Sequence, residues 1–217
     1  MQTVRYGRRV LADTHRHALE LVCQRLVSTP VDWAVSGSAA LALQGVPVSC
    51  ADLDLATTAL DAGAVERALA GHVIEPVGRR ARGAIRGHLG RSELASIEVE
   101  ILGDVQNLLP DGTWTPPPRL DEHTNYVALN GRRCPVLDLS YLRAVYVTMG
   151  RTDTVHLIDD RLLAELIAVA EERSYARLVL APSARAAPFF QRSGFVAADE
   201  SSGELLLVRS AAGRHAR

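Results

Sequence analysis

The residues best suited to chemistry in this sequence are acids placed at alternate positions in two apolar segments. Asp52 and Asp54 stand in ADLDLATT, and Glu98 and Glu100 stand in SIEVEIL. Because side chains alternate between the two faces of a β-strand, the acids of each pair share one face and the apolar residues share the other. Two such carboxylates and a third from a neighbouring strand suit Mg²⁺, which prefers oxygen ligands and retains substrate phosphates in its shell. The pattern predicts a magnesium site held by Asp52, Asp54 and either glutamate, of which we favour Glu100.

A glycine turn upstream of these acids offers groups that can bind phosphate. The segment VDWAVS indicates a short buried strand that ends at Ser36, and Gly37 and Ser38 then open a helix. A helix begins with free backbone N–H groups and a positive end, and glycine lets a phosphate approach the backbone closely. We expect a triphosphate to bind at Ser36, Gly37 and Ser38. Taken singly, the acidic strand and the turn are more often a solvated edge and a plain turn, so their order along the chain carries the prediction.

The elements that must position these groups alternate between helices and strands. Hydrophobic periodicity and turn residues predict helices at 10–28, 37–44, 64–70, 139–151 and 159–173, with strands at 31–36, 51–58, 82–90 and 96–102. The proline-rich run 111–121 predicts a loop, either a flap over the site or plain surface, and an Asn-Gly pair predicts a hairpin over 126–138. The alternation indicates an α/β fold: a mixed sheet with flanking helices.

The order of these motifs resembles the polymerase-beta-like nucleotidyltransferase superfamily. The resemblance is carried by SGSAALALQGVPVSCADLDLATT and SIEVEILGD, and it extends over about residues 31–153. It implies transfer of a nucleoside monophosphate from a nucleoside triphosphate to a hydroxyl of a small molecule or macromolecule, with two Mg²⁺ ions held by Asp52, Asp54 and Glu100 (or Glu98). The third acid would also serve as general base.

Within that superfamily, the chain is most similar to the small bacterial antibiotic nucleotidyltransferases and to nucleotidyltransferase-like toxins and antitoxins. The segment LDLSYLRAVYVTMGRTD resembles the helical segment that follows their sheet, which implies phosphate contacts for Arg143 and Arg151. Surface ion pairs are the alternative role for both arginines. A non-catalytic nucleotide-binding or antitoxin-like regulatory protein would retain most of the same pattern, so that function stays open.

A second resemblance lies near the C-terminus. The segment AELIAVAEERSYARLVLAPSARAAPFFQRSGFVAADE is similar to the second half of a GNAT acetyltransferase, with a signature formed by Phe189, Phe190, Gln191, Arg192, Ser193, Gly194 and Phe195. Two departures argue against acetyl-CoA as a cofactor. HLIDDR lacks the glycines of the family's pyrophosphate loop, and Phe190 replaces the tyrosine that donates a proton. We expect a truncated module, with N-acetyl transfer as the competing function.

These observations predict three segments: a nucleotidyltransferase-like domain at 1–153, a small GNAT-like α/β half-domain at 154–210 and a disordered tail at 211–217. The net charge is −1, which gives no overall field to attract a polyanion. A tRNA partner therefore stays open but is not implied. A protein partner or a homodimer also stays open. All the basic residues are arginine, which excludes a catalytic lysine. The basic run VGRRARGAIRGHLGR predicts either an anion site or a solvated face.

The cysteines and histidines indicate no zinc site. The three cysteines are far apart in the sequence without CxxC spacing, and the histidines are isolated or lie on different helix faces. The N-terminal segment has no apolar signal core and no run is long enough to span a membrane, so we expect a cytoplasmic protein.

Overall fold

The computed structural model describes residues 11–70, 72–175, 177–182, 186–197 and 204–208. The chain separates into two compact units, residues 1–161 and residues 162–217. The predicted tail at 211–217 lies outside the described residues. Among the described helices, none is long and apolar enough to cross a membrane.

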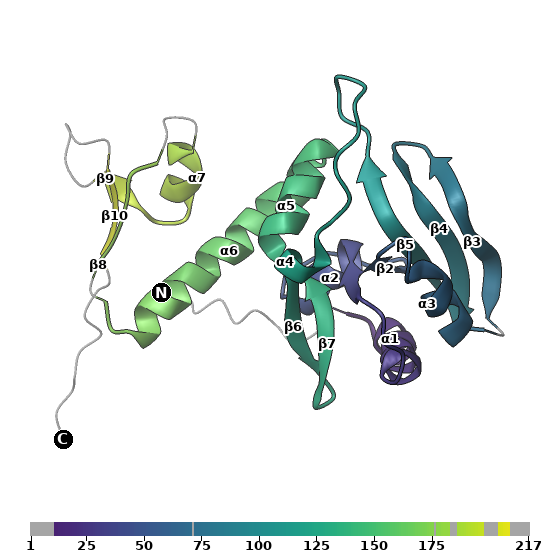
Figure 1. Ribbon diagram of the computed structural model, residues 1–217. Coiled ribbons are helices and arrows are strands. Elements are labelled where there is room, and N and C mark those ends of the chain that lie inside the picture. Colours follow the sequence, from purple (N-terminus) through teal and green to yellow (C-terminus); the bar gives the residue numbers. More distant parts are fainter. Residues whose placement is uncertain (1–10, 71, 176, 183–185, 198–203, 209–217) are drawn as a thin grey trace. The chain divides into compact units, whose positions relative to one another are not determined.

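A seven-stranded mixed sheet forms the centre of the first unit (Figure 1). Its strands are β1 (Trp33–Ser36), β2 (Leu53–Thr57), β3 (Val73–Arg82), β4 (Ile85–Leu94), β5 (Ile97–Asn107), β6 (Thr124–Leu129) and β7 (Arg132–Leu137). They lie in the order β3-β4-β5-β2-β1-β7-β6. β2 runs antiparallel to β1 and parallel to β5, and β1 runs parallel to β7. The predicted α/β class, with a mixed sheet and flanking helices, is confirmed.

Helices cover this sheet through apolar residues at helical spacing. They are α1 (Asp13–Leu26), α2 (Gly37–Leu43), α3 (Ala62–Ala68), α4 (Leu120–His123), α5 (Leu139–Thr148) and α6 (Thr152–Glu172). The helix α1 buries Ala18, Leu19 and Val22, as the periodicity predicts. It packs with α3 near β3, β4 and β5, whereas α2 packs on β1 and β2 and contacts α5. The helix α2 therefore covers β1 and β2, the strands that carry the predicted site residues Ser36 and Asp54, and it also contacts α5.

The sequence prediction lacks a strand over residues 73–82, where the structure has the edge strand β3. Its sequence VIEPVGRRAR contains a proline, a glycine and three arginines, which interrupt the usual strand pattern. Ion pairs balance part of its charge, because Glu75 accepts hydrogen bonds from Arg82 of the same strand and from Arg91 of β4, each at 2.8 Å. Part of the basic run is thus the outer hairpin of the sheet.

The boundary between α5 and α6 is a second correction. The sequence predicts a connection over 152–159, but these residues belong to the 21-residue helix α6. Val155 and Ile158 are buried three positions apart, which continues the helical periodicity into this segment. The break falls earlier, at Gly150, whose φ is +69°. The Asn-Gly hairpin at Asn130 and Gly131 is confirmed, and both residues have positive φ.

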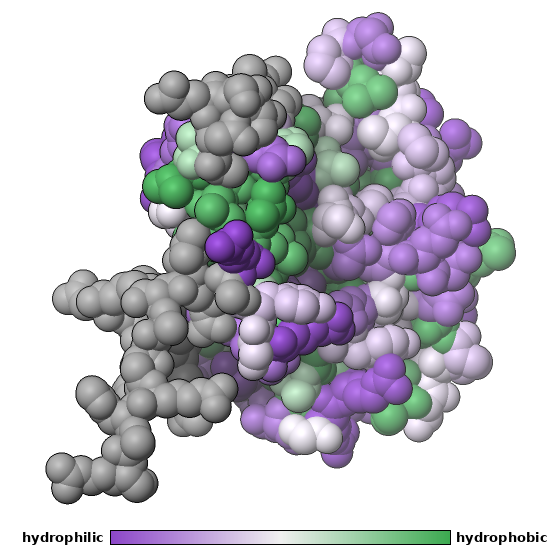
Figure 2. Space-filling model, turned by 90° about the vertical axis from the view of Figure 1, so that its left-hand side faces the viewer, coloured by the Kyte–Doolittle hydropathy of each residue, from purple (hydrophilic) through white to green (hydrophobic). Residues whose placement is uncertain are grey.

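The second unit combines the end of α6 with a small antiparallel sheet. Its elements are β8 (Arg177–Leu180), α7 (Ala187–Arg192), β9 (Val196–Ala197) and β10 (Leu205–Val208), with strand order β8-β10-β9. Leu163, Phe195 and Leu205 form its core. Val179 and Val196 are about half exposed, and Figure 2 shows apolar side chains at the surface of this unit. The phenylalanines of the predicted signature pack together, with Phe190 edge-on to Phe195 at 5.8 Å between ring centres.

Candidate active site

Three predicted site residues lie side by side on adjacent strands. Ser36 on β1 pairs with Asp54 on β2, and Asp54 pairs with Glu100 on β5. Residues paired across neighbouring strands project from the same face of a sheet. Asp52 lies just before β2 and shares the face of Asp54, while Leu53 and Leu55 are fully buried on the other. The period of two thus directs the acids to one cavity and the leucines to the core.

Gly37 lets the carboxylate of Asp54 lie against the backbone at the start of α2. Its φ is +57°, a left-handed conformation that residues with a Cβ adopt at a cost. A Cβ built at Gly37 would lie 1.8 Å from Oδ2 of Asp54, which is well inside contact distance. The glycine therefore both makes the turn and makes room for the acid.

These groups line a cavity of about 300 Å³ in the first unit. That volume is at the lower end of the range for small-molecule sites. Polar groups at one part of the wall face apolar and aromatic groups at another. The lining residues are Ser36, Gly37, Ser38, Asp52, Asp54, Ile85, Glu100, Leu102, Val105, Asn107, Pro118, Leu137, Tyr141, Leu142, Val145, Tyr146, Met149 and Arg151.

Burial, together with the negative charge of neighbouring acids, raises the pKa of two of the acids. Burial and the neighbouring charges of Asp52 and Glu100 raise the pKa of Asp54 to about 7, with Arg151 opposing them. The pKa of Glu100 is also raised, chiefly by burial, although Arg82 opposes this shift. A site in which carboxylates repel one another in this way favours a bound cation.

The two candidate glutamates of β5 occupy different surroundings. Glu100 lines the cavity, and its Oε1 accepts a hydrogen bond of 2.6 Å from Nη1 of Arg82. Glu98 is outside the cavity lining, and its Oε1 lies 3.5 Å from Nη1 of Arg91. The side chain of Glu98 is 40% exposed and that of Glu100 is 19% exposed. Of the two, the structure brings Glu100 to the aspartates.

The two candidate phosphate arginines are also separated. Arg151 follows α5, lines the cavity, and is close enough to Asp54 to lower its pKa. Arg143 points to α6, where its Nη2 donates to Oδ2 of Asp159 at 3.1 Å. Arg143 is thus engaged in an ion pair and does not belong to the cavity lining.

Helix α5 brings residues to the cavity that the acidic and glycine motifs did not indicate. Tyr141 and Tyr146 both line it, and burial and the charge of Asp54 raise the pKa of Tyr146, with Arg151 opposing. Their five-residue spacing in LSYLRAVYVTMGR predicts only a helix, because it does not reveal which face meets the sheet. Pro118, from the predicted loop at 111–121, also lines the cavity, so that loop borders the site.

The acids do not form a closed metal cage in this conformation. Within the described parts of the chain, no group of three or more His, Cys, Asp or Glu residues is arranged to hold a metal ion. The carboxylate of Glu100, which lines the same cavity as the aspartates, is paired with Arg82. The donor set nevertheless suits a hard cation, since carboxylate and hydroxyl oxygens are the ligands that Mg²⁺ prefers.

Comparisons with known proteins support membership of the nucleotidyltransferase superfamily, which the sequence motifs also indicate. The model of the aminoglycoside-2''-adenylyltransferase family matches residues 18–161. A solved structure from Thermotoga maritima, provisionally described as a nucleotidyltransferase, is 32% identical, with 72% of this chain and 98% of that chain covered and a TM-score of 0.62. Comparison with curated protein sequences found no significant match.

Two antibiotic adenylyltransferases are among the more distant structural matches. ANT(2")-Ia in complex with adenylyl-2"-tobramycin is 13% identical, over 83% of this chain and 99% of that chain, with a TM-score of 0.48. The lincosamide antibiotic adenylyltransferase LnuA with bound lincomycin is 10% identical, over 66% of this chain and 95% of that chain, with a TM-score of 0.45. The family match ends at residue 161, so the GNAT-like character of the second unit stays a prediction.

Proposed function

The chain belongs to the aminoglycoside-2''-adenylyltransferase family and is a nucleotidyltransferase, and from this we propose that it transfers AMP from ATP to a hydroxyl group of a small molecule. The observation that carries the proposal is the alignment of Ser36, Asp54 and Glu100 on three adjacent strands, beside Asp52 and in one cavity.

We assign Asp52, Asp54 and Glu100 as the residues that would hold Mg²⁺. The raised pKa of Asp54 supports this assignment, because a cation between the acids would relieve their repulsion. Bound Mg²⁺ would supply positive charge to the phosphate oxygens during the transfer. Because Arg82 pairs with Glu100, Mg²⁺ and this guanidinium would share or compete for the same carboxylate. Glu98 then remains on the surface, paired with Arg91.

The remaining groups of the cavity have separate tasks. Ser36, Gly37 and Ser38 offer hydroxyl and backbone N–H donors to the triphosphate, and Arg151 adds a positive charge. Glu100 accepts the proton of the acceptor hydroxyl, whose oxygen forms a bond to the α-phosphorus while the bond to pyrophosphate breaks.

The acceptor would be a small molecule that fits beside the helix α5. Two distant matches carry antibiotics or an adenylylated antibiotic, and both are small. The cavity lining also includes Tyr141, Leu142 and Tyr146, all from α5. Flat or apolar parts of the nucleotide or of the acceptor can pack on these side chains.

A transfer assay tests the proposal. Purified protein is incubated with Mg²⁺, ATP labelled at the α-phosphate and a panel of small hydroxyl compounds that includes aminoglycosides and lincosamides, and products are identified by mass spectrometry. We expect an AMP-bearing product and pyrophosphate with wild type, and a loss of at least about a thousandfold in rate for Asp52→Asn. Tight binding of Mg²⁺–ATP without turnover on any acceptor would favour a non-catalytic nucleotide-binding protein.

A further inference from the structure

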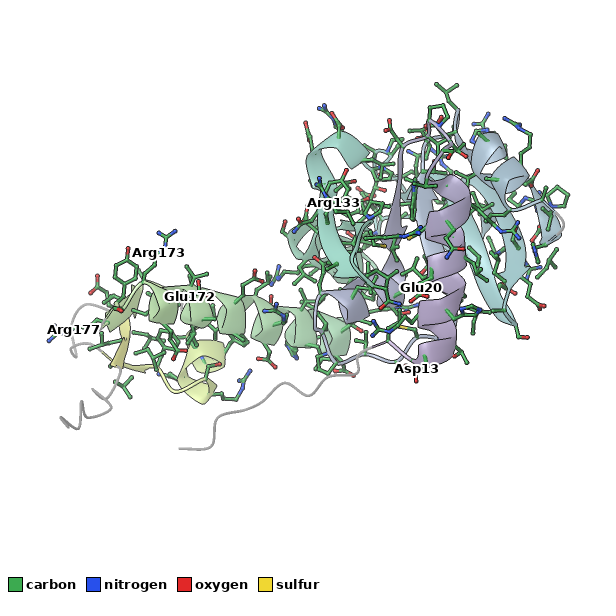
Figure 3. All side chains as sticks on the ribbon, turned by 90° about the horizontal axis from the view of Figure 1, so that it is seen from below. Asp13, Glu20, Arg133, Glu172, Arg173 and Arg177 are labelled. Atoms are coloured by element: carbon green, nitrogen blue, oxygen red, sulfur yellow. The ribbon has the colours of Figure 1, made fainter. Side chains whose placement is uncertain are left out.

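Two thiols outside the proposed active site face each other inside the first unit. Cys23 lies on α1 and Cys134 lies on β7, 111 positions apart in the chain, and their sulfur atoms are 3.8 Å apart. A disulfide bond is about 2.05 Å long. The two sulfur atoms must therefore come about 1.8 Å closer for a bond to form. Figure 3 marks Glu20 on α1 and Arg133 on β7, the two elements that carry the thiols.

The two thiols differ in their exposure and in the direction of their pKa shifts. Cys23 is half-buried and borders a surface groove together with Val27, Trp33 and Arg132, whereas Cys134 is fully buried. The hydrogen bond with Cys134 lowers the pKa of Cys23; burial opposes this shift, and the charge of Arg132 adds to it. The same hydrogen bond and burial raise the pKa of Cys134. Cys23 is thus the accessible thiol that more readily becomes a thiolate.

We propose that Cys23 and Cys134 are an oxidisable pair that a peroxide converts to an intramolecular disulfide. The Cys23 thiolate attacks one oxygen of the peroxide, the O–O bond breaks, and Cys23 becomes a sulfenic acid while hydroxide leaves as water. The sulfur of Cys134 then attacks the sulfur of Cys23 and displaces its hydroxyl group as water. In total, two thiols and one hydrogen peroxide give one disulfide and two molecules of water.

The disulfide would join α1 to β7, the strand that pairs with β1 of the candidate site. Val136, two residues after Cys134, pairs with Val35, next to Ser36 at the end of β1. The disulfide would also close a long loop that contains Asp52, Asp54 and Glu100. Closing a long loop restricts the unfolded chain, so the oxidised protein should melt at a higher temperature than the reduced protein.

The third cysteine provides a matched control. Cys50 is also half-buried, but among the described residues the sulfur–sulfur contact joins Cys23 to Cys134 and does not include Cys50. It should stay reduced under conditions that oxidise Cys23. The Cys50→Ser variant should therefore form the same disulfide as wild type.

The test exposes the reduced full-length protein to a small excess of hydrogen peroxide and counts free thiols, with intact-mass and peptide-mass analysis. We expect the free thiols to fall from three to one, with a Cys23–Cys134 peptide, a monomeric mass lower by two hydrogens, and a melting temperature that returns to its starting value with a reductant. Cys134→Ala should instead accumulate sulfenic acid at Cys23, which a dimedone probe detects. Retention of all three thiols, a disulfide that involves Cys50, or a bond between two chains would each overturn the proposal.

Discussion

The contact between Gly37 and the carboxylate of Asp54 leaves no space for a side chain at position 37. We predict that Gly37→Ala displaces Asp54 and weakens Mg²⁺–ATP binding by more than about tenfold, with a stability loss of roughly 2–4 kcal/mol. Gly83→Ala is the matched control, since Gly83 has a similar φ of +59° and no atom within 4 Å of its Cβ position. It should cost only about 1 kcal/mol for the backbone conformation. Urea unfolding and calorimetric titration measure both effects, and equal losses of binding in the two variants would contradict the account.

The raised pKa of Asp54 makes the stability of the metal-free protein depend on pH. The folded protein holds this proton up to about pH 7, whereas an unfolded chain releases it near pH 4. The unfolding free energy of wild type should therefore fall as the pH rises from about 4 to about 7. Asp54→Asn removes this fall and should be more stable than wild type at pH 8, by roughly 2–4 kcal/mol.

Urea unfolding in metal-free buffer across this pH range measures the effect of Asp54→Asn. The exposed Asp160→Asn serves as its control and should follow the wild-type curve. Parallel pH profiles for wild type and Asp54→Asn would show that the carboxyl of Asp54 titrates normally.

At the scale of elements, the N-terminus of α5 depends on Asp138, whose side chain accepts a hydrogen bond of 2.8 Å from the backbone N of Tyr141. Because α5 supplies Tyr141 and Tyr146 to the cavity, the cap connects helix stability with the site. We predict that Asp138→Ala lowers the unfolding free energy by about 1 kcal/mol. Asp138→Asn should lower the unfolding free energy much less, because asparagine can also cap a helix. Chemical denaturation of both variants measures the difference, and equal losses would show that the cap contributes little.

The elements that could be predicted are those whose periodicity matches their burial. The alternation of Asp52, Leu53, Asp54 and Leu55 identifies β2 because one face of that strand is core and the other is site. The strand β3 has no such alternation, since it lies at the sheet edge and is stabilised by ion pairs to Glu75. Pro76, Gly78 and the arginines interrupt any apolar alternation, so a local pattern does not reveal this strand.

At the scale of the whole chain, the two units have separate cores. Phe195 is buried with Leu163 and Leu205 in the second unit, whereas the candidate active site lies in the first. We predict that Phe195→Ala destabilises the second unit by roughly 3 kcal/mol and leaves Mg²⁺–ATP affinity unchanged. Hydrogen exchange resolved by peptide measures the local effect, with Val196→Ala, at an exposed position, as the control. Loss of nucleotide binding in Phe195→Ala would show that the first unit depends on the second.

The residue types of the candidate site could be predicted in part from the sequence, and their meeting depends on the strand order of the whole sheet. Strand order brings β1, β2 and β5 together, so motifs up to 64 residues apart in the chain, such as Ser36 and Glu100, meet at one face. The motifs gave the residue types, but the choice between Glu98 and Glu100 depends on the register of β5 against β2. The ion pair of Arg82 with Glu100 depends on β3, the strand that sequence patterns did not indicate.

The most direct test of the proposed site is a calorimetric titration of ATP into wild type and Asp54→Asn, each with Mg²⁺ and with excess chelator. We expect wild type to bind ATP in Mg²⁺ and to bind it more than about tenfold more weakly with excess chelator. Asp54→Asn with Mg²⁺ present should show an equal loss of affinity. ATP affinity that is the same in all four titrations would contradict a metal–nucleotide site at Asp52, Asp54 and Glu100.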